Sequence, residues 1–324
     1  MAFRFKLGES FEEGFRRIAL EQIDQATAQL SQDGQQALAV HETRKALKRL
    51  RALLRLMRPA IGNDAFKSEN AQLRDIGLSL SGARDRHVLL ETASKLAAAG
   101  RLGRRGVAES LQQAIQAANG AGEPLSFGGA AQRLGEARKR LAKLTVEGSG
   151  FDVVGEGLEM SYREARRAFH HAYEEPSDEA FHEWRKGAQR HWRQMGLLSR
   201  AWTDCLEARA REARELSQLL GDDHDLAILS AFVHDDSATG LREEAAAVIE
   251  TAARRRQQEL RTAARPRGDR LFVAGAKRLR RDVAVYWDAA VRLKALQKDD
   301  SSAPPARVRR SGGPRRRPPA GEEV

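Results

Sequence analysis

The sequence has a single cysteine, Cys205, among 324 residues, so the chain cannot form an internal disulfide. That scarcity fits a reducing compartment. No run of about 18 apolar residues occurs, which argues against a membrane-spanning helix. The first residues also lack the apolar stretch of a secretory signal. We therefore expect a protein of a reducing compartment that has no membrane partner.

Familiar catalytic signatures are missing as well. The sequence contains neither the G-x-x-x-x-G-K loop that binds nucleotide phosphates nor the G-x-S-x-G turn of serine hydrolases. It also lacks the alternating glutamates of a triphosphate-tunnel enzyme. No group of residues is convincing for nucleophilic or acid–base chemistry. We therefore expect a binding protein that is not an enzyme and needs no cofactor.

Acidic residues are outnumbered: 45 Asp and Glu stand against 56 Lys and Arg, which gives a net charge of +11. Such a surplus favours an anionic partner. Part of it lies in residues 298–324, which are rich in Pro, Ser, Gly and Arg and which we predict to be a disordered basic tail. The tail holds seven basic and four acidic residues, so +8 remains on the rest of the chain. The basic character therefore belongs mainly to the body.

Before residue 298, apolar residues recur with the period of a helix, and no segment alternates as a strand does. The predicted fold class is all-α. The expected helices cover 11–30, 40–57, 66–80, 88–99, 104–118, 130–144, 151–173, 181–200, 207–219, 241–264 and 271–296. We expect Pro59 with Gly62, and segment 265–268, to end helices, segment 221–225 to form a turn, and Asp85 to cap a helix.

The segment 40–57, VHETRKALKRLRALLRLM, carries the most informative pattern. On a helical wheel of about 100° per residue, its histidine and most of its basic residues share one arc beside the apolar arc. Like charges three or four residues apart repel by about 0.2–0.5 kcal/mol per pair, so stability alone would not select such a row. A solvated basic face is the plain alternative. A row of cations beside the core-facing stripe favours an extended polyanion as ligand.

The same pattern occurs twice. Segment 181–195, FHEWRKGAQRHWRQM, places His182 in line with His41 at an offset of 141 residues. Segment 80–90, LSGARDRHVLL, likewise matches 220–229, LGDDHDLAIL, and aligns Asp85 with Asp225 at an offset of 140. A nearly constant offset over two motifs indicates an internal duplication. The second copy departs from the first at Gln189 and Trp192.

These motifs resemble the CHAD domain family. Its signature is a paired H-x-x-R-x-x-x-[KR]-R-x-R helix followed by an L-x-G-x-R-D segment, and the resemblance covers about residues 5–297. It implies two pseudo-symmetric helical bundles, 5–145 and 150–297, with a basic groove or pore between them. It also implies binding of inorganic polyphosphate and a cytoplasmic location on polyphosphate granules.

The expected polyphosphate-binding residues are the cations and histidines of the motif helices and their neighbours. They are His41, Arg44, Lys48, Arg49, Arg51, Arg55, Arg84, Arg163, Arg166, Arg167, His182, Arg185, Lys186, Arg190 and Arg193.

Other interpretations remain. Segment 222–225, Asp-Asp-His-Asp, could hold a metal or serve a phosphohydrolase, but only its last Asp recurs in the first half, so we predict no metal site. Glu179 and His182 match half of a di-iron signature, whose second half is absent. The two motif histidines could simply lie at a helix interface. Nucleic acid is the rival ligand, bound non-specifically by the tail, although only 6% of residues are aromatic and could stack on bases. The direction in which the cations point would separate the two ligands.

Overall fold

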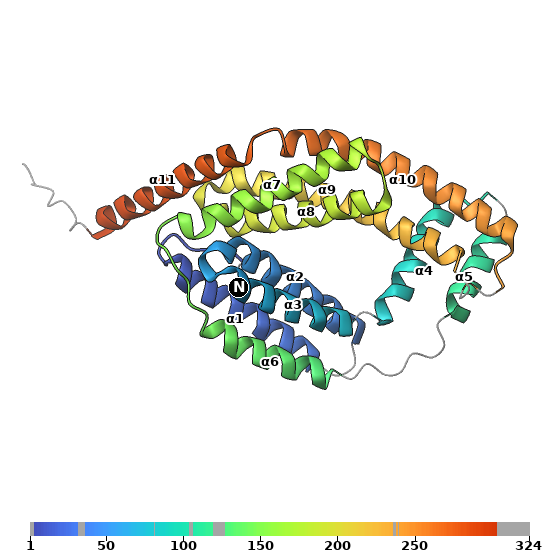
Figure 1. Cartoon of the computed structure of the whole chain (residues 1–324), viewed down its shortest axis with the longest axis horizontal. Coiled ribbons are helices and arrows are strands. Elements are labelled where there is room, and N and C mark those ends of the chain that lie inside the picture. The colour runs from blue at the N-terminus through green and yellow to red at the C-terminus, as the bar shows by residue number, and fades with distance from the viewer. Residues whose placement is uncertain are drawn as a thin grey trace, which may run out of the picture.

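The computed structural model describes residues 3–31, 36–80, 82–103, 106–118, 127–235, 238 and 240–302, and for 82–85 and 298–302 it describes the backbone alone. Over these residues the chain is helical and contains no strand, which confirms the predicted all-α class (Figure 1). None of the described helices combines the length and the apolar character that a bilayer span requires.

The helices follow one another closely along the chain. Those of the first half are α1 (Phe11–Leu30), α2 (Gln36–Ile61), α3 (Asn63–Ser79), α4 (Gly82–Ala98), α5 (Val107–Ala118) and α6 (Gly128–Ala142). Those of the second half are α7 (Asp152–Glu174), α8 (Asp178–Leu197), the 3-10 turn η1 (Ser199–Ala201), α9 (Thr203–Val233), α10 (Glu243–Leu271) and α11 (Ala276–Ser302).

Two serine caps set where α1 and α8 begin. At α1, the Ser10 hydroxyl accepts from the Glu13 amide at 3.1 Å and the Glu13 carboxylate accepts from the Ser10 amide at 2.8 Å. At α8, the Ser177 hydroxyl accepts from the Ala180 amide at 3.1 Å. Each bond satisfies an amide that the first turn leaves without a helical partner.

Three of the predicted breaks were wrong. Pro59 lies inside α2, Pro266 lies inside α10, and α9 runs unbroken through 221–225. A glycine inside a helix costs about 1 kcal/mol and a proline about 3 kcal/mol, so tertiary burial must compensate. In α9, Leu220 and Leu226 are buried on both sides of Gly221, and their packing keeps the helix continuous through it.

Two other predicted boundaries also change. Helix α4 begins at Gly82, so the backbone places Asp85 inside the first turns and not at the N-cap; its side chain lies outside the described part. Helix α11 extends to Ser302, so the expected tail boundary at residue 298 falls within a helix. Residues 303–324 lie outside the described part of the chain, and their disorder stays a prediction.

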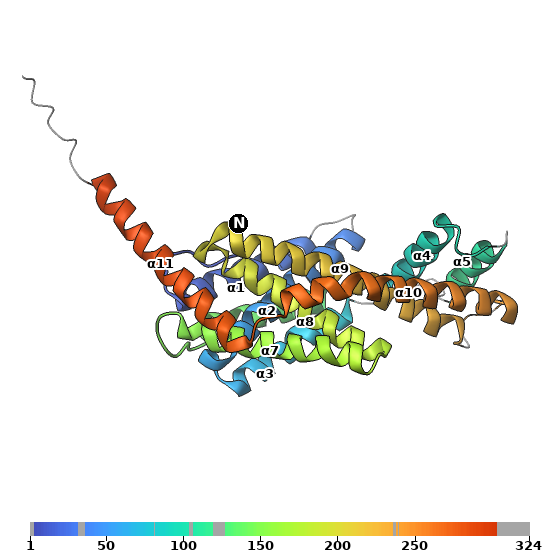
Figure 2. The ribbon, with the colours of Figure 1, turned by 90° about the horizontal axis from the view of Figure 1, so that it is seen from above.

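The hydrophobic interior has two separate cores. The larger one joins α1, α2, α3 and α6 to α7, α8, the first part of α9, the end of α10 and the start of α11. The smaller one joins α4 and α5 to the second part of α9 and the first part of α10. Figures 1 and 2 show α4, α5 and the adjoining parts of α9 and α10 at one end of an elongated molecule. Each core therefore draws on both halves of the chain.

The two halves show parallel features. Helix α1 packs on α2 as α7 packs on α8, and α6 returns to α1 as α11 returns to α7. Both motif helices carry the same ion pair at i,i+3, Glu42 with Lys45 and Glu183 with Lys186. The superposition of 5–145 on 150–297 stays a prediction.

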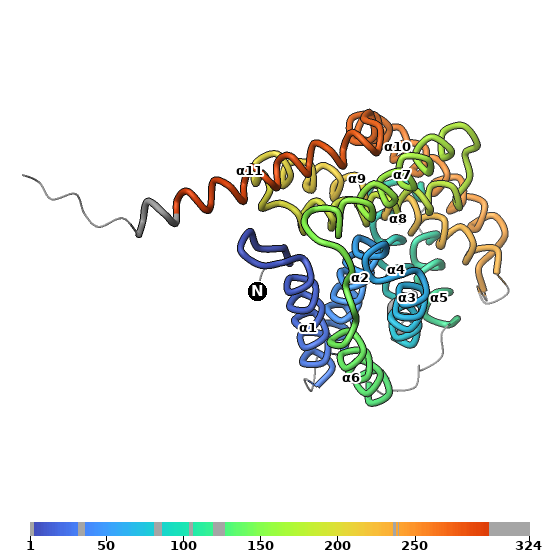
Figure 3. Tube along the Cα trace, turned by 60° about the vertical axis from the view of Figure 1, so that its left-hand side comes forward, coloured from blue at the N-terminus to red at the C-terminus, as the bar shows by residue number. Residues whose placement is uncertain are grey.

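Close packing brings the two motif helices together. Helix α2 packs against both α7 and α8, and Figure 3 shows it where the α1, α2, α3 and α6 layer meets the α7–α11 layer. A Cβ atom on Gly157 of α7 would collide with the backbone of Leu56 in α2. A Cβ atom on Gly187 of α8 would lie 2.9 Å from Ala165 of α7. Glycine at these positions permits the short separations that set the site.

Candidate functional site

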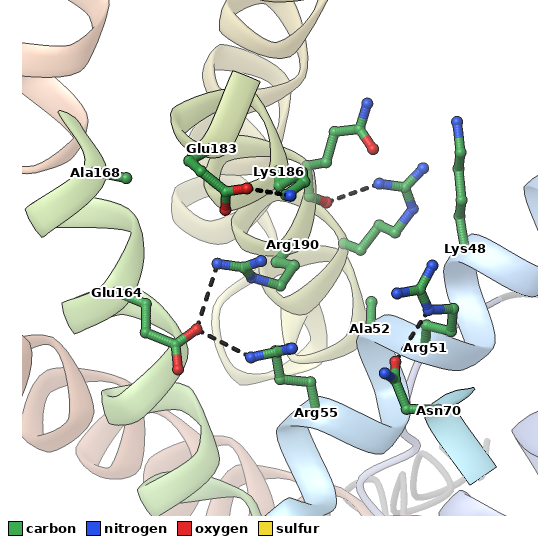
Figure 4. A pocket seen from close by; sticks show the side chains of 12 residues that line it. Lys48, Arg51, Ala52, Arg55, Asn70, Glu164, Ala168, Glu183, Lys186 and Arg190 are labelled. Carbon is green, nitrogen blue, oxygen red and sulfur yellow. Dashed lines mark hydrogen bonds and ion pairs between the residues drawn. The ribbon is translucent and has the colours of Figure 1, made fainter. Parts of the chain in front are cut away.

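A cavity of about 540 Å³, which we name the basic pocket, lies between α2 and α8, with walls from α3 and α7 (Figure 4). Six cations and two carboxylates line it, a surplus of four positive charges. The cations are Lys48, Arg51, Arg55, Lys186, Arg190 and Arg193, and the carboxylates are Glu164 and Glu183.

Helical spacing explains why the cations gather there. On α2, the three cations are spaced by three and four residues, so they share one face, while Leu50 and Leu54 are fully buried on another. On α8, Lys186, Arg190 and Arg193 have the same spacing by four and three residues. The structure therefore brings part of each predicted basic stripe into one cavity.

Glu164 joins these stripes from the side of α7. Its Oε2 accepts from Nη1 of Arg55 at 3.0 Å and from Nη2 of Arg190 at 3.4 Å (Figure 4). Arg51 is held separately, because its Nε donates to Oδ1 of Asn70 on α3 at 3.0 Å. Sequence reasoning missed both Glu164 and Asn70. The only sequence signal for Glu164 is that it interrupts the basic run of α7.

The pocket holds its arginines at an electrostatic cost. Burial lowers the pKa of Arg190 to about 10, with a further lowering from the neighbouring Arg55. Burial also lowers the pKa of Arg193 to about 10, helped by Arg49. The pKa of Arg51 falls through burial and then through Arg55. Desolvation and like charges both disfavour the charged form, so a bound anion would relieve all three side chains.

Two buried guanidinium nitrogens in the pocket have N–H groups that donate no hydrogen bond to a described residue. Nε of Arg190 and Nε of Arg193 are buried and have no hydrogen-bond partner among the described residues. Nη1 of Arg193 donates to the Gln189 carbonyl at 2.8 Å, and its guanidinium lies 4.3 Å from the centroid of the Trp192 ring. Of the two positions where the second motif departs from the first, Trp192 therefore contacts Arg193 through its side chain, whereas Gln189 does so only through its backbone carbonyl. Buried donors without partners are uncommon and favour a ligand that accepts hydrogen bonds.

The basic lining continues along α2 beyond the pocket. A second cavity of about 110 Å³ shares Lys48 and Arg51 with the basic pocket and adds Arg44 and Arg74. Nη1 of Arg44 donates to the Gly77 carbonyl near the end of α3 at 2.7 Å. The two cavities give a basic path along α2 toward its N-terminus.

Two of the expected site residues make structural contacts elsewhere. Arg49 donates from Nη1 to Oε1 of Gln22 on α1 at 3.3 Å. Arg166 donates from Nε to the Phe272 carbonyl at 3.0 Å. Neither lines the basic pocket. These contacts tie α2 to α1 and α7 to the end of α10.

Other expected residues lie at the surface or outside the described part. Arg163 pairs with Glu159 on its own helix, and Arg167 is exposed. The His41 side chain is 63% exposed and does not line the pocket. The side chain of Arg84 is not among those described. Their part in ligand binding stays a prediction.

His182 and Arg185 do not line the basic pocket, although they adjoin Glu183 and Lys186 along α8. His182 meets a histidine that the predicted set did not include. The two Nδ1 atoms of His182 and His224 are 3.1 Å apart, and Nη2 of Arg185 lies 3.3 Å from Nδ1 of His182. Burial lowers the pKa of His182 to about 4 and that of His224 to about 3, and Arg185 adds to both shifts. Both rings are therefore neutral at pH 7, and the Nδ1–H of one ring donates a hydrogen bond to Nδ1 of the other.

The acids around His224 point to different partners. Nε of Arg261 on α10 donates to Oδ1 of Asp223 at 2.7 Å, and Nζ of Lys95 on α4 donates to Oδ1 of Asp222 at 3.2 Å. Among the described residues, no three or more metal-ligating side chains converge on one point. The 222–225 segment thus ties α9 to α10 and α4.

Comparison with protein families gives a match over most of the chain. A family model described as CHAD domain matches residues 17–234, a range that contains every residue lining the basic pocket. Comparison with curated proteins returned no match. Helices α10 and α11 lie beyond the matched range. Because the match covers well over half of the sequence, the chain belongs to the CHAD domain family.

Proposed function

We propose that the basic pocket binds inorganic polyphosphate and that the chain acts by binding, not by catalysis. The observation that carries the proposal is the convergence of six cations from α2 and α8 on one cavity. The association of the CHAD domain family with polyphosphate supports the same ligand. It also supports a cytoplasmic location on polyphosphate granules.

The side-chain chemistry suits a chain of phosphates. A guanidinium binds two phosphate oxygens through paired N–H groups, whereas the lysine ammonium acts as a compact charge. Nε of Arg190 and Nε of Arg193 have no hydrogen-bond partner among the described residues, so a phosphate that reached them would satisfy both donors. The basic path along α2 would let an unbranched polymer continue from the pocket past Arg44. A polyanion would also offset the mutual repulsion and lost solvation of the arginines.

Nucleic acid fits the pocket less well. The pocket cations face one another between helices, and the lining contains no aromatic side chain on which a base could stack. Non-specific contact through the Arg-rich segment 303–324 is a separate property that net charge alone would supply.

Competition binding tests this proposal. Labelled long-chain polyphosphate, bound to the full chain at physiological salt, should be displaced by unlabelled polyphosphate at much lower concentration than by DNA or RNA. Equal displacement by nucleic acid of the same charge would overturn the assignment of ligand.

A matched pair of variants tests the site. Replacing Lys48, Arg51 and Lys186 together by Gln removes three charges from the pocket and should weaken polyphosphate binding by more than tenfold. Replacing Arg315, Arg316 and Arg317 by Gln removes the same charge from the tail and should change affinity only slightly. If both triple variants lose affinity equally, only net charge matters and the pocket is not the site.

A further inference from the structure

Helix α11 leaves the body of the protein before it ends (Figures 1 and 2). Its first turns are anchored by Val283 and Trp287, which are buried. Every residue from 291 to 297 is exposed. Large apolar side chains stay in contact with water here: Val285 is 62% exposed, Leu293 59% and Leu296 64%. A helix with such a surface normally covers it with a partner.

Four apolar residues of α11 form one stripe, while Val291, 39% exposed, lies on another side of the helix. At about 100° per residue, Val285, Ala289, Leu293 and Leu296 fall within about 80° of the helix circumference. Beside the stripe, a cavity of about 490 Å³ separates α11 from the N-terminal segment and is lined in part by Leu7 and Leu293. The stripe offers an apolar surface for a second helix, and the cavity beside it is also lined by Lys6, Arg200 and Lys294.

Charges along one edge of the stripe indicate which helix that is. Arg281, Asp288 and Arg292 follow one another at spacings of seven and four residues, and in the sequence an aspartate at position 299 continues the series after seven more. The four charges alternate in sign from positive to negative along the helix. Read from the other end, the series begins with a negative charge, so in an antiparallel copy each charge meets one of opposite sign. Two copies of α11 running antiparallel therefore oppose Asp288 to Arg292 twice, with no like-charge pair along this edge.

From this self-complementary edge and the exposed stripe, we infer that α11 is a dimerisation helix, which packs antiparallel on α11 of a second copy about a two-fold axis near Ala290. An isologous contact of this kind closes on itself and stops at two subunits. The sequence beyond Ser302 cannot take this place from within the chain, since it holds no amphipathic segment. Helix α11 lies outside residues 17–234, the range that the family model matches.

Sedimentation of the full chain tests the dimer. The wild type should sediment with twice the monomer mass, and the double variant Leu293→Glu, Leu296→Glu should sediment as a monomer. The control replaces two other exposed apolar residues, Leu38 and Val273, by Glu and should remain dimeric. A wild type that is monomeric at tens of micromolar, including one that binds anionic vesicles instead, would overturn the inference. So would a stripe variant that remains dimeric.

Charge swapping and cross-linking test the antiparallel arrangement. Asp288→Arg and Arg292→Asp should each weaken the dimer, and the two together should restore it. In a Cys205→Ser background, Ala289→Cys should form an intermolecular disulfide. Val285→Cys should not, because an axis near residue 290 separates the two copies of position 285 by about 15 Å along the helices. A disulfide at position 285 as efficient as that at 289 indicates parallel helices and contradicts the arrangement.

Discussion

Arg55 of α2 and Glu164 of α7 form an ion pair 3.0 Å long inside the basic pocket. The pair joins the first half of the chain to the second. The same carboxylate also reaches Arg190 of α8. Glu164 thus occupies the position between two guanidinium groups that a phosphate of the proposed ligand would take.

Replacing Glu164 by Gln should therefore tighten polyphosphate binding. The amide keeps the shape of the side chain but removes the charge with which phosphate competes. Because the side chain is 41% exposed, the gain should be that of a solvated ion pair, about 0.5–1 kcal/mol, or two- to fivefold in Kd by titration calorimetry. Glu174→Gln, at the exposed end of the same helix, removes equal charge and should leave Kd within error. Unchanged or weaker binding by the Glu164 variant would show that phosphate does not displace this carboxylate.

Salt should weaken binding steeply, because each phosphate contact releases a counterion. A plot of log affinity against log salt should lose about 0.7 from its slope for each pocket cation removed, as for single-stranded nucleic acids. The Lys48, Arg51, Lys186 triple variant should thus show a slope shallower by about two, measured between 50 and 300 mM salt. The tail triple variant provides the comparison and should keep the wild-type slope. A parallel line for the pocket variant would count against direct phosphate contacts.

Removing residues 303–324 should leave the thermal stability nearly unchanged. The segment has no apolar periodicity with which to join a core. The cut preserves α11 through Ser302, so the melting temperature should move by less than about 2 °C in differential scanning fluorimetry, a shift that corresponds to about 1 kcal/mol for a chain of this length. A shorter protein that ends at residue 290 also lacks the exposed end of α11, and its melting temperature serves as the comparison. A large loss of stability on cutting after Ser302 would mean that the tail packs on the body.

Acid should destabilise the protein through His182 and His224. Both have folded pKa values, about 4 and about 3, below the ordinary value of 6.5. The unfolded chain therefore binds more protons as pH falls below 6.5, and the stability present above that pH is lost progressively toward pH 3. Chemical denaturation between pH 7 and pH 4 should show this loss.

The double variant His182→Asn, His224→Asn should have a shallower dependence of unfolding free energy on pH over that window. Part of the slope should survive, because the pKa of buried His191 is also lowered, by burial and by Arg209. His41→Asn, at an exposed position, is the control and should keep the full slope. Identical slopes for wild type and the double variant would rule out the histidine pair as the cause.

The sequence by itself determined the class of the fold and one face of each motif helix. Helical periodicity is local, so it predicted the all-α class and placed Lys48 and Arg51 beside the apolar stripe that buries Leu50. The paired motifs indicated the CHAD domain family for the same reason, since each motif lies on one helix. Predictions failed where a residue that disfavours helix locally is compensated by the burial of its neighbours against distant parts of the chain. Pro59, Pro266 and Gly221 all lie within helices that such burial keeps continuous.

Only the tertiary structure decided which groups face one another. No pattern within α7 predicts that Glu164 reaches Arg55, a residue 109 positions earlier. Arg49 and Arg166 carry the same charge as the pocket cations, yet they turn to Gln22 and to the Phe272 carbonyl. Local spacing sets the direction of a side chain from its own helix axis, whereas its neighbours depend on how helices distant in sequence pack. That packing is fixed by contacts such as Gly157 against α2, which depend on the shapes of both surfaces.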